Sequence, residues 1–196
     1  MAGNFTLEGK NGDIALKMLK DVTDLLDQHS IPYWLEGGTL LGVIRENRLL
    51  PWDNDLDISI KNSHLDRLQQ ALKELNWRYR VRVREFEKNE PPFQKSAIRL
   101  IKIKNRKLLF FSGEVSLDIF IKFEKDNEIF WQIGDKRKSV PSRFYDELLK
   151  YEFDGKEYLV PKLYREYLTF RYGDWQTVVK EWNTFKDDKA LQGDKQ

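Results

Sequence analysis

Residues 53–60 alternate between polar and apolar side chains, and this pattern constrains the fold more than any other in the chain. A period of two is typical of a β-strand that is buried on one face. One face of the predicted strand carries Asp53, Asp55, Asp57 and Ser59, and the other carries Leu56, Ile58 and Ile60. Carboxylates at alternate strand positions lie about 6.6 Å apart and repel one another. The pattern therefore predicts either a bound cation or a polar strand face exposed to solvent.

The composition narrows the choice of cation. The chain has no cysteine and only two histidines, His29 and His64, which excludes zinc sites built from thiolates or histidine clusters. An EF-hand loop is excluded because Ile58 stands where that loop needs glycine and His64 where it needs glutamate. Carboxylate oxygens suit Mg²⁺ or Mn²⁺. Asp118 interrupts the apolar run over residues 115–123 and supplies the third carboxylate that a two-metal site requires.

The tripeptide Gly37-Gly38-Thr39 lies between a short predicted strand, residues 33–36, and a short predicted helix, residues 40–45. Two glycines allow a backbone to approach a ligand closely, and the N–H groups that open a helix favour phosphate. The alternative interpretation is an ordinary turn. Because the acidic strand follows one helix later, phosphate together with metal is the simpler account.

The remaining periodicities predict an α+β fold, a mixed β-sheet flanked by helices. Further helices are predicted over residues 14–26, 63–75, 163–173 and 178–185. Further strands are predicted over residues 78–86, 97–103, 108–111, 114–123 and 128–133, with a hairpin turn at 104–107. We predict a single domain over residues 1–196, with its motifs at 14–175 and a frayed tail at 187–196.

The glycine turn and the acidic strand together resemble the LicD family, bacterial phosphocholine transferases to which fukutin and fukutin-related protein are similar. The matching residues are Tyr33–Arg45, Leu50–Ile58, Leu117–Phe120, Val160-Pro161 and Tyr172–Trp175. The family belongs to the nucleotidyltransferase-fold superfamily, whose pattern is a Gly-Gly or Gly-Ser turn, Asp-x-Asp and a third carboxylate. This chain departs from the family at Asn54, where aspartate is usual, and at Glu46, where histidine is common.

The resemblance implies a role for each candidate site residue. Asp55, Asp57 and Asp118 would bind two Mg²⁺ or Mn²⁺ ions, and Asp118 could also act as general base. Asp53 would be a further ligand or would support the others. The residues that would hold the donor's phosphates are Gly37, Gly38, Thr39 and Arg45. The aromatic residues Trp52, Tyr172 and Trp175 are candidates for stacking on substrate, with core packing as the alternative for each.

The resemblance also implies an activity. The enzyme would be a metal-dependent transferase that moves a phospho-alcohol group, such as phosphocholine, from CDP-choline or a similar CDP-alcohol. The acceptor would be a hydroxyl of a glycan or lipid-linked glycan in cell-surface polysaccharide biosynthesis, and CMP would be released. One alternative is a nucleotidyltransferase that places a nucleoside monophosphate on a small molecule or protein and releases pyrophosphate. A second is a non-catalytic nucleotide-binding module, which the complete set of three carboxylates disfavours.

Charge and hydropathy bear on partners and location. The formal net charge of +2 disfavours a nucleic-acid partner. No apolar run approaches the roughly 18–20 residues of a membrane span, and no export signal is evident, which predicts a cytoplasmic protein with peripheral association at the inner membrane face. Arg78, Arg80, Arg82 and Arg84 alternate along one predicted strand. They indicate either a solvated sheet face or a surface for an anionic acceptor, lipid headgroups or nucleic acid.

Overall fold

The computed structural model describes residues 5–107 and 111–192. Its helices are α1 (Lys10–Gln28), α2 (Gly37–Glu46), α3 (Leu65–Ala71) and α4 (Tyr164–Tyr172), with 3₁₀ turns at Asn62–His64, Leu72–Glu74 and Ser142–Tyr145. Its strands are β1 (Trp34–Leu35), β2 (Leu56–Lys61), β3 (Tyr79–Glu85), β4 (Ile98–Lys107), β5 (Phe111–Lys125), β6 (Glu128–Ile133), β7 (Lys136–Pro141), β8 (Leu148–Phe153) and β9 (Lys156–Pro161). The predicted α+β class with a mixed sheet is confirmed.

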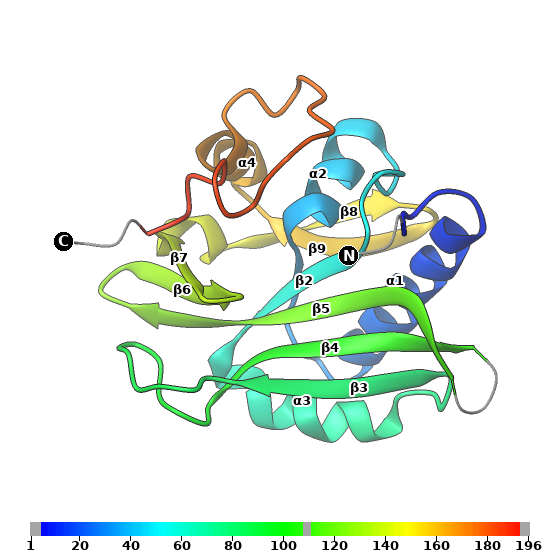
Figure 1. Ribbon diagram of the computed structural model, residues 1–196, viewed down its shortest axis with the longest axis horizontal. Helices are drawn as coiled ribbons and strands as arrows, with labels where there is room; N and C mark the ends of the chain where they lie inside the picture. Colours follow the sequence, from blue (N-terminus) through cyan, green and yellow to red (C-terminus); the bar gives the residue numbers. More distant parts are fainter. Residues whose placement is uncertain (1–4, 108–110, 193–196) are drawn as a thin grey trace.

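Seven strands form the central sheet (Figure 1). Its path runs β1-β2-β5-β4-β3, and β6 pairs with both β5 and β7. β2 and β5 are parallel, and the other neighbours are antiparallel. The parallel pair sets Asp57 directly beside Asp118. Because register partners project to the same face of a sheet, the topology brings together two carboxylates that are 61 positions apart in the sequence.

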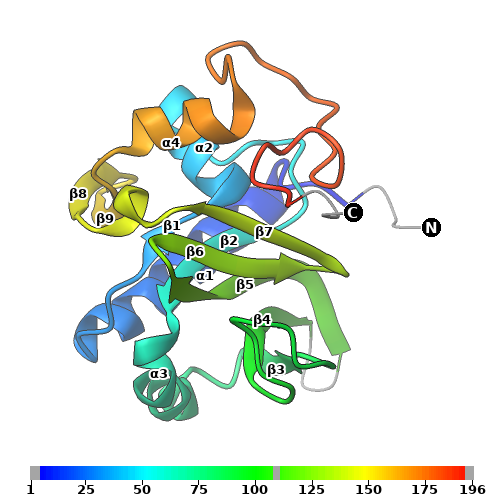
Figure 2. The same ribbon diagram turned by 90° about the vertical axis from the view of Figure 1, so that its left-hand side faces the viewer.

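The core lies between the sheet and the helices behind it. Helices α1 and α3 cover one face of the sheet, whereas no helix of the described residues covers the opposite face of β3 and β4 (Figures 1 and 2). The side chains of α1 that are buried include Met18, Leu19, Val22 and Leu26. They face fully buried strand residues, among them Ile101, Ile103, Leu117, Ile119 and Ile121. Burying such side chains stabilises the fold by about 1.5–3 kcal/mol each.

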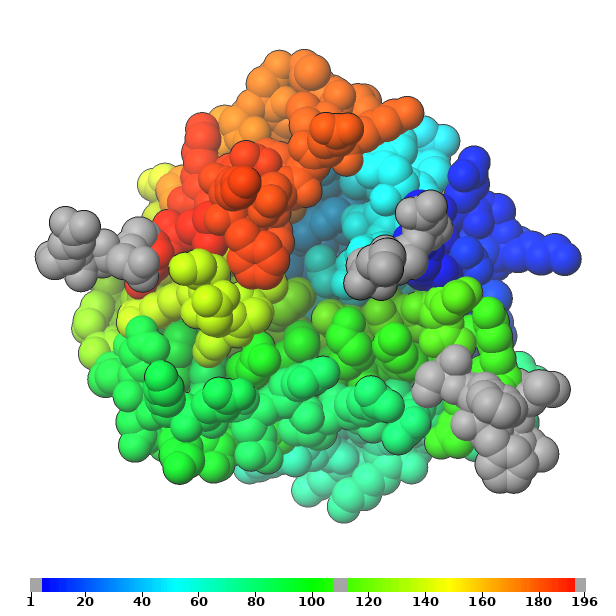
Figure 3. Space-filling model, in the orientation of Figure 1, coloured from blue at the N-terminus to red at the C-terminus, as the bar shows by residue number. Residues whose placement is uncertain are grey.

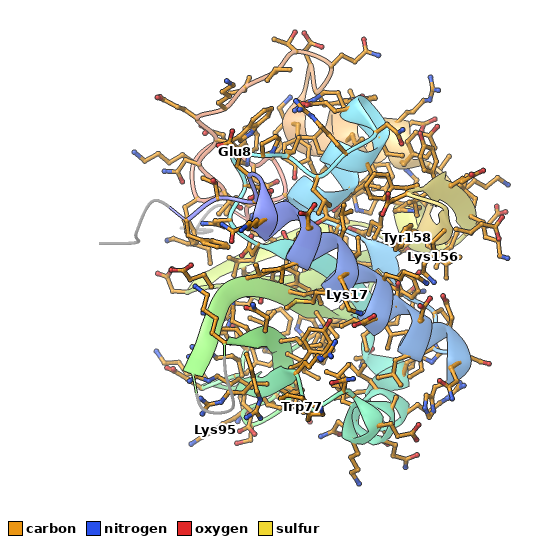
Figure 4. The ribbon with its side chains drawn as sticks, turned by 90° about the vertical axis from the view of Figure 1, so that its right-hand side faces the viewer. Glu8, Lys17, Trp77, Lys95, Lys156 and Tyr158 are labelled. Carbon is orange, nitrogen blue, oxygen red and sulfur yellow. The ribbon has the colours of Figure 1, made fainter. Side chains whose placement is uncertain are left out.

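The β8–β9 hairpin packs beside α1. Lys156, at the start of β9, lies within 2.7 Å of both Asp24 and Asp27 of the helix, and Figure 4 shows it between the two elements. No helix in the part of the chain that the structure describes is both long enough and apolar enough to span a bilayer.

The structure corrects several predicted boundaries. The segment over residues 104–107 is not a turn, because it continues β4. Lys104 and Asn105 pair with β3, and Lys104, Arg106 and Lys107 pair with β5 across a register shift. The strand predicted over 108–111 falls mainly on residues outside the described ranges. The strand predicted from residue 53 begins only at Leu56, because Asp53 closes a turn with its N–H donating to the carbonyl of Leu50.

The C-terminal segment also differs from the expectation. No helix forms over residues 178–185, and the tail is not frayed up to residue 192, since Asp188 and Ala190 are buried. Both carboxylate oxygens of Asp188 are held by side chains of distant elements, Lys138 in β7 and Arg171 in α4. These long-range ion pairs override the local helical pattern.

Candidate active site

Three carboxylates converge on one face of the sheet, beside the first turn of α2. Asp57 lies on β2, Asp118 lies on β5, and Asp55 comes from the loop that leads into β2. Each offers an oxygen atom, and the three oxygens lie within 4.8 Å of one another. The structure therefore brings together the three residues that the sequence singles out, although only Asp57 and Asp118 lie on strands. Asn54 is exposed.

The environment of these carboxylates disfavours three negative charges. Burial, reinforced by the charges of Asp53 and Asp118, raises the pKa of Asp55 to about 7. Burial and the charge of Asp55 raise the pKa of Asp57 well above its ordinary value. Burial also raises the pKa of Asp118 and that of Asp53. A hard divalent cation neutralises the repulsion between clustered carboxylate oxygens that are shielded from water, so these residues fit a metal centre.

Lys102 of β4 is a site residue that the sequence patterns do not reveal. Its Nζ lies 2.8 Å from Oδ1 of Asp118, its register partner on β5. In the described ranges it is the only cation paired with any of the three carboxylates. The sequence places Lys102 in a basic segment, and only the strand register shows that it points at the acidic cluster.

Removing the charge of Lys102 is expected to strengthen metal binding. The ammonium competes with a cation for Asp118, so Lys102→Met should tighten Mn²⁺ binding about tenfold, which corresponds to one charge-assisted contact. Electron paramagnetic resonance of free Mn²⁺ measures the affinity. Lys107→Met is the matched control, because Lys107 also reaches from β4 to a carboxylate of β5, Glu114, but in the open. An unchanged affinity in Lys102→Met would show that the ammonium does not compete.

The pH dependence of stability provides a second check. In the metal-free protein the raised pKa of Asp55, about 7 against 3.8, lets the folded state hold a proton that the unfolded chain has released. Stability should therefore fall as the pH rises from about 5 to about 7. Thermal unfolding in EDTA measures this slope, which Mn²⁺ or Asp55→Asn should flatten. His64→Gln is the control, since burial lowers the pKa of His64 and gives the opposite sign. A slope unchanged in Asp55→Asn would contradict the assignment.

The two glycines make room for the carboxylates. A Cβ on Gly37 would collide with Oδ2 of Asp57, and a Cβ on Gly38 would collide with Oδ2 of Asp53. Gly37 also has a positive φ of 56°, which favours glycine. Both residues belong to the first turn of α2, which begins earlier than predicted because Glu36 caps it and accepts the N–H of Gly37. Glycine is thus required at both positions, because the side chains of Asp57 and Asp53 approach the backbone there.

A cavity of about 440 Å³ opens in front of the carboxylates. Figure 3 shows the hollow between the cyan segment around α2, the orange and red C-terminal segment and the green strands. The cavity is lined by the acidic cluster and by aromatic rings, among them Trp52, Trp131, Tyr172, Trp175 and Trp182. The sequence singles out Trp52, Tyr172 and Trp175, whereas Trp131 and Trp182 come from segments that carry no motif.

Three of the four predicted phosphate-binding residues line the cavity, and the fourth does not. Gly37, Gly38 and Arg45 line the cavity. Thr39 does not, because it is buried and its hydroxyl accepts the N–H of Asp57 at 2.8 Å. Arg45 donates to Glu46 at 2.7 Å, so its charge is already partnered. The hydroxyl of Thr39 thus fixes the position of the Asp57 backbone.

A buried ionic network adjoins the cavity, and two of its members, Glu36 and Arg171, line it. Glu36 is 2% exposed and pairs with Lys122 at 3.0 Å and with Arg171 at 2.8 Å. The ammonium of Lys122 lies 3.3 Å from the ring centroid of Trp131, which lines the cavity. Arg171 continues the network to Asp188. The segment beyond α4 is thereby tied to the first turn of α2.

Fold and site together define a domain of the nucleotidyltransferase type. The family model described as LicD/FKTN/FKRP, nucleotidyltransferase domain, matches residues 30–163, and the chain belongs to this family. The resemblance inferred from the sequence is confirmed. The solution structure of the antibiotic-resistance factor ANT(2'')-Ia shares the fold, with a TM-score of 0.50 and 13% identity over 88% of this chain and 78% of that one.

Relatives extend over much of the chain. An uncharacterized protein of Rickettsia typhi is 32% identical over 81% of this chain and 45% of its own length. The ribitol-5-phosphate transferase FKTN of Homo sapiens is 25% identical over 86% of this chain and 34% of its length. The lipopolysaccharide cholinephosphotransferase LicD of Haemophilus influenzae is 37% identical over 29% of this chain and 20% of its length. The chain thus corresponds to about half or less of these proteins.

Proposed function

We propose that this domain transfers a phospho-alcohol group from a CDP-alcohol to a glycan hydroxyl and releases CMP. The observation that carries the proposal is the convergence of Asp55, Asp57 and Asp118 on a cavity lined with aromatic rings. Membership of a family whose named relatives include ribitol-phosphate and choline-phosphate transferases supports the choice of group. Phosphoryl transfer needs positioning and charge neutralisation more than covalent help, and the site offers both.

Asp55, Asp57 and Asp118 would hold two Mg²⁺ or Mn²⁺ ions, with Asp53 behind them. Such ions neutralise charge that develops on the phosphate and leaving oxygens. The acceptor oxygen would form a bond to the phosphorus that bears the alcohol, while the bond from that phosphorus to the CMP oxygen breaks. Asp118 would receive the hydroxyl proton, and CMP would leave with the bonding electrons.

The cavity walls would orient the donor. The rings of Trp52, Tyr172 and Trp175 offer flat surfaces on which a pyrimidine base can stack. Gly37 and Gly38, in the first turn of α2, line the cavity beside the carboxylates. Their backbone would contact the donor's phosphates there. Arg45, which also lines the cavity, would add positive charge near the donor's phosphates while its guanidinium pairs with Glu46.

Phosphorus NMR distinguishes this activity from the alternatives. The protein is incubated with Mg²⁺ or Mn²⁺, candidate glycans, and either a panel of CDP-alcohols or nucleoside triphosphates. The proposal predicts CMP from at least one CDP-alcohol. Pyrophosphate from a triphosphate, with every CDP-alcohol intact, would instead establish nucleotidyl transfer. Turnover of no donor, with tight nucleotide binding, would establish a binding module.

The same proposal extends to location. A cytoplasmic enzyme that uses a lipid-linked glycan would meet the inner face of the membrane through its acceptor. Cell fractionation checks this, because recovery of the protein outside the cell would contradict it.

A further inference from the structure

A single row of charged side chains crosses four strands of the sheet. Asp57 on β2 neighbours Asp118 on β5, Asp118 neighbours Lys102 on β4, and Lys102 neighbours Arg82 on β3. Since register partners share a face, all four side chains lie on the same face of the sheet. The first turn of α2 packs against this face at Asp57, whereas no helix of the described residues covers it at β3 and β4. The row changes sign from acidic to basic at Lys102, so the carboxylate site continues directly into a basic surface.

The basic surface comprises the side chains of Arg80, Arg82, Arg84, Lys102 and Lys104. Arg82 stands opposite Lys102 and Arg80 opposite Lys104, and like charges that face each other across two strands are destabilising. In the described ranges, Lys102 alone among the five has an ion-pair partner. Elsewhere on the surface, exposed lysines such as Lys17 and Lys162 do have acidic partners. Five cations are thus gathered on one face of two neighbouring strands, in a chain whose net charge is only +2.

The basic surface adjoins the three carboxylates of the site. The Nζ of Lys102 lies 2.8 Å from Oδ1 of Asp118, so the surface and the carboxylates are in direct contact. In Figure 3 the green strands form the surface beside the opening of the hollow. A ligand lying across β3 and β4 would thus extend into the site.

We propose that the basic surface binds the acceptor, and that the acceptor is a glycan bearing several phosphate or carboxylate groups. This inference rests on the proposed function. Arginine is suited to such groups because its planar guanidinium matches their oxygens in pairs. The anionic groups would lie along β3 and β4, which brings a hydroxyl of the same chain to Asp118.

The alternatives fit the surface less well. Single-stranded nucleic acids are bound by basic grooves interleaved with aromatic rings, and neither β3 nor β4 presents an aromatic side chain on this face. A peripheral membrane site adds apolar side chains that enter the bilayer. The exposed apolar residue of β3, Val83, alternates onto the opposite face from Arg82 and Arg84.

A binding measurement without donor or metal tests the inference. The probe is dextran phosphate, with unsubstituted dextran of the same length as the neutral comparison, measured by isothermal titration calorimetry. The test variant combines Arg80→Gln, Arg82→Gln and Arg84→Gln, all exposed side chains without ion pairs. The matched control combines Lys17→Gln, Lys73→Gln and Lys162→Gln, which removes the same charge from other elements. Circular dichroism checks that both variants are folded.

We expect dextran phosphate to bind in a salt-dependent manner, about tenfold more weakly in the arginine variant and less than about twofold more weakly in the control. Equal losses in the two variants, or undiminished binding in the arginine variant, would overturn the proposal. Tighter, arginine-dependent binding of a single-stranded oligonucleotide or of phosphatidylglycerol vesicles would overturn it in favour of those partners.

The binding assay is independent of catalysis. If no CDP-alcohol turns over yet dextran phosphate binds as expected, the proposed transfer fails while the surface assignment stands. If CDP-alcohols do turn over while the arginine variant binds normally, the surface assignment fails alone. With an active acceptor, the arginine variant should raise KM for that acceptor and leave kcat nearly unchanged, because the arginines do not touch the reacting atoms.

Discussion

Asp55→Ala, Asp57→Ala and Asp118→Ala are each expected to reduce transfer on the order of 10³-fold or more while the protein stays folded. The three carboxylates provide the charge that would hold the metal ions. Because they repel one another, removing one should not lower the stability of the metal-free protein.

The controls are Asp66→Ala, which removes an exposed carboxylate from α3, and Asn54→Ala, which removes an exposed side chain between two site residues. Both should retain nearly full activity, and Asp53→Ala should fall between the two groups. Turnover is measured as CMP release, with circular dichroism as the check on folding. Near-normal turnover in any two of the three variants would rule out the metal-dependent account.

Glu36→Gln is expected to lower the free energy of unfolding by about 3–5 kcal/mol. Although burial alone would raise it, Lys122 and Arg171 hold the pKa of Glu36 well below its usual range, so the residue is an anion at neutral pH. Its removal leaves Lys122 buried without the carboxylate that it pairs with, and it leaves Arg171 paired with Asp188 but not with residue 36. Three further donors, Trp34, Ser59 and Tyr145, share its Oε2 and would lose a charged acceptor.

Urea denaturation at neutral pH measures this effect. Glu157→Gln is the matched control, because Glu157 pairs with Lys150 at 2.8 Å on the surface, where an ion pair contributes about 0–1 kcal/mol. A loss below about 1 kcal/mol in Glu36→Gln would show that the network does not support the fold.

Local patterns predict the parts of this molecule that depend on local chemistry. The 3.6-residue spacing in α1 and the alternation in β2 and β5 reflect burial against one layer, so they are visible in the sequence. The convergence of Asp57 with Asp118 also follows from two such strands once they are neighbours. The irregular loop that carries Asp53 and Asp55 cannot be predicted in this way, because alternating polar residues give the same sequence pattern in a strand and in the turn that precedes it.

The residues that sequence reasoning misses act through long-range register. Lys102 belongs to the site only because β4 pairs with β5, and Glu36 is buried only because Lys122, Arg171 and two tyrosines surround it. Thr39 looks like a phosphate ligand in sequence, yet its hydroxyl is used by the backbone of Asp57. The helix expected over residues 178–185 fails for a related reason, since the ion pairs of Asp188 determine the path of that segment.

Titration with Mn²⁺ tests the central claim most directly, because every step of the proposed transfer depends on a metal centre at the three carboxylates. Electron paramagnetic resonance at about pH 7.5 follows free Mn²⁺ as protein is added, for the unaltered chain and for Asp57→Ala. The account predicts saturable binding of up to two ions by the unaltered chain and its loss in Asp57→Ala. Equal binding by both proteins, or a free Mn²⁺ signal that the unaltered chain does not diminish, would contradict it.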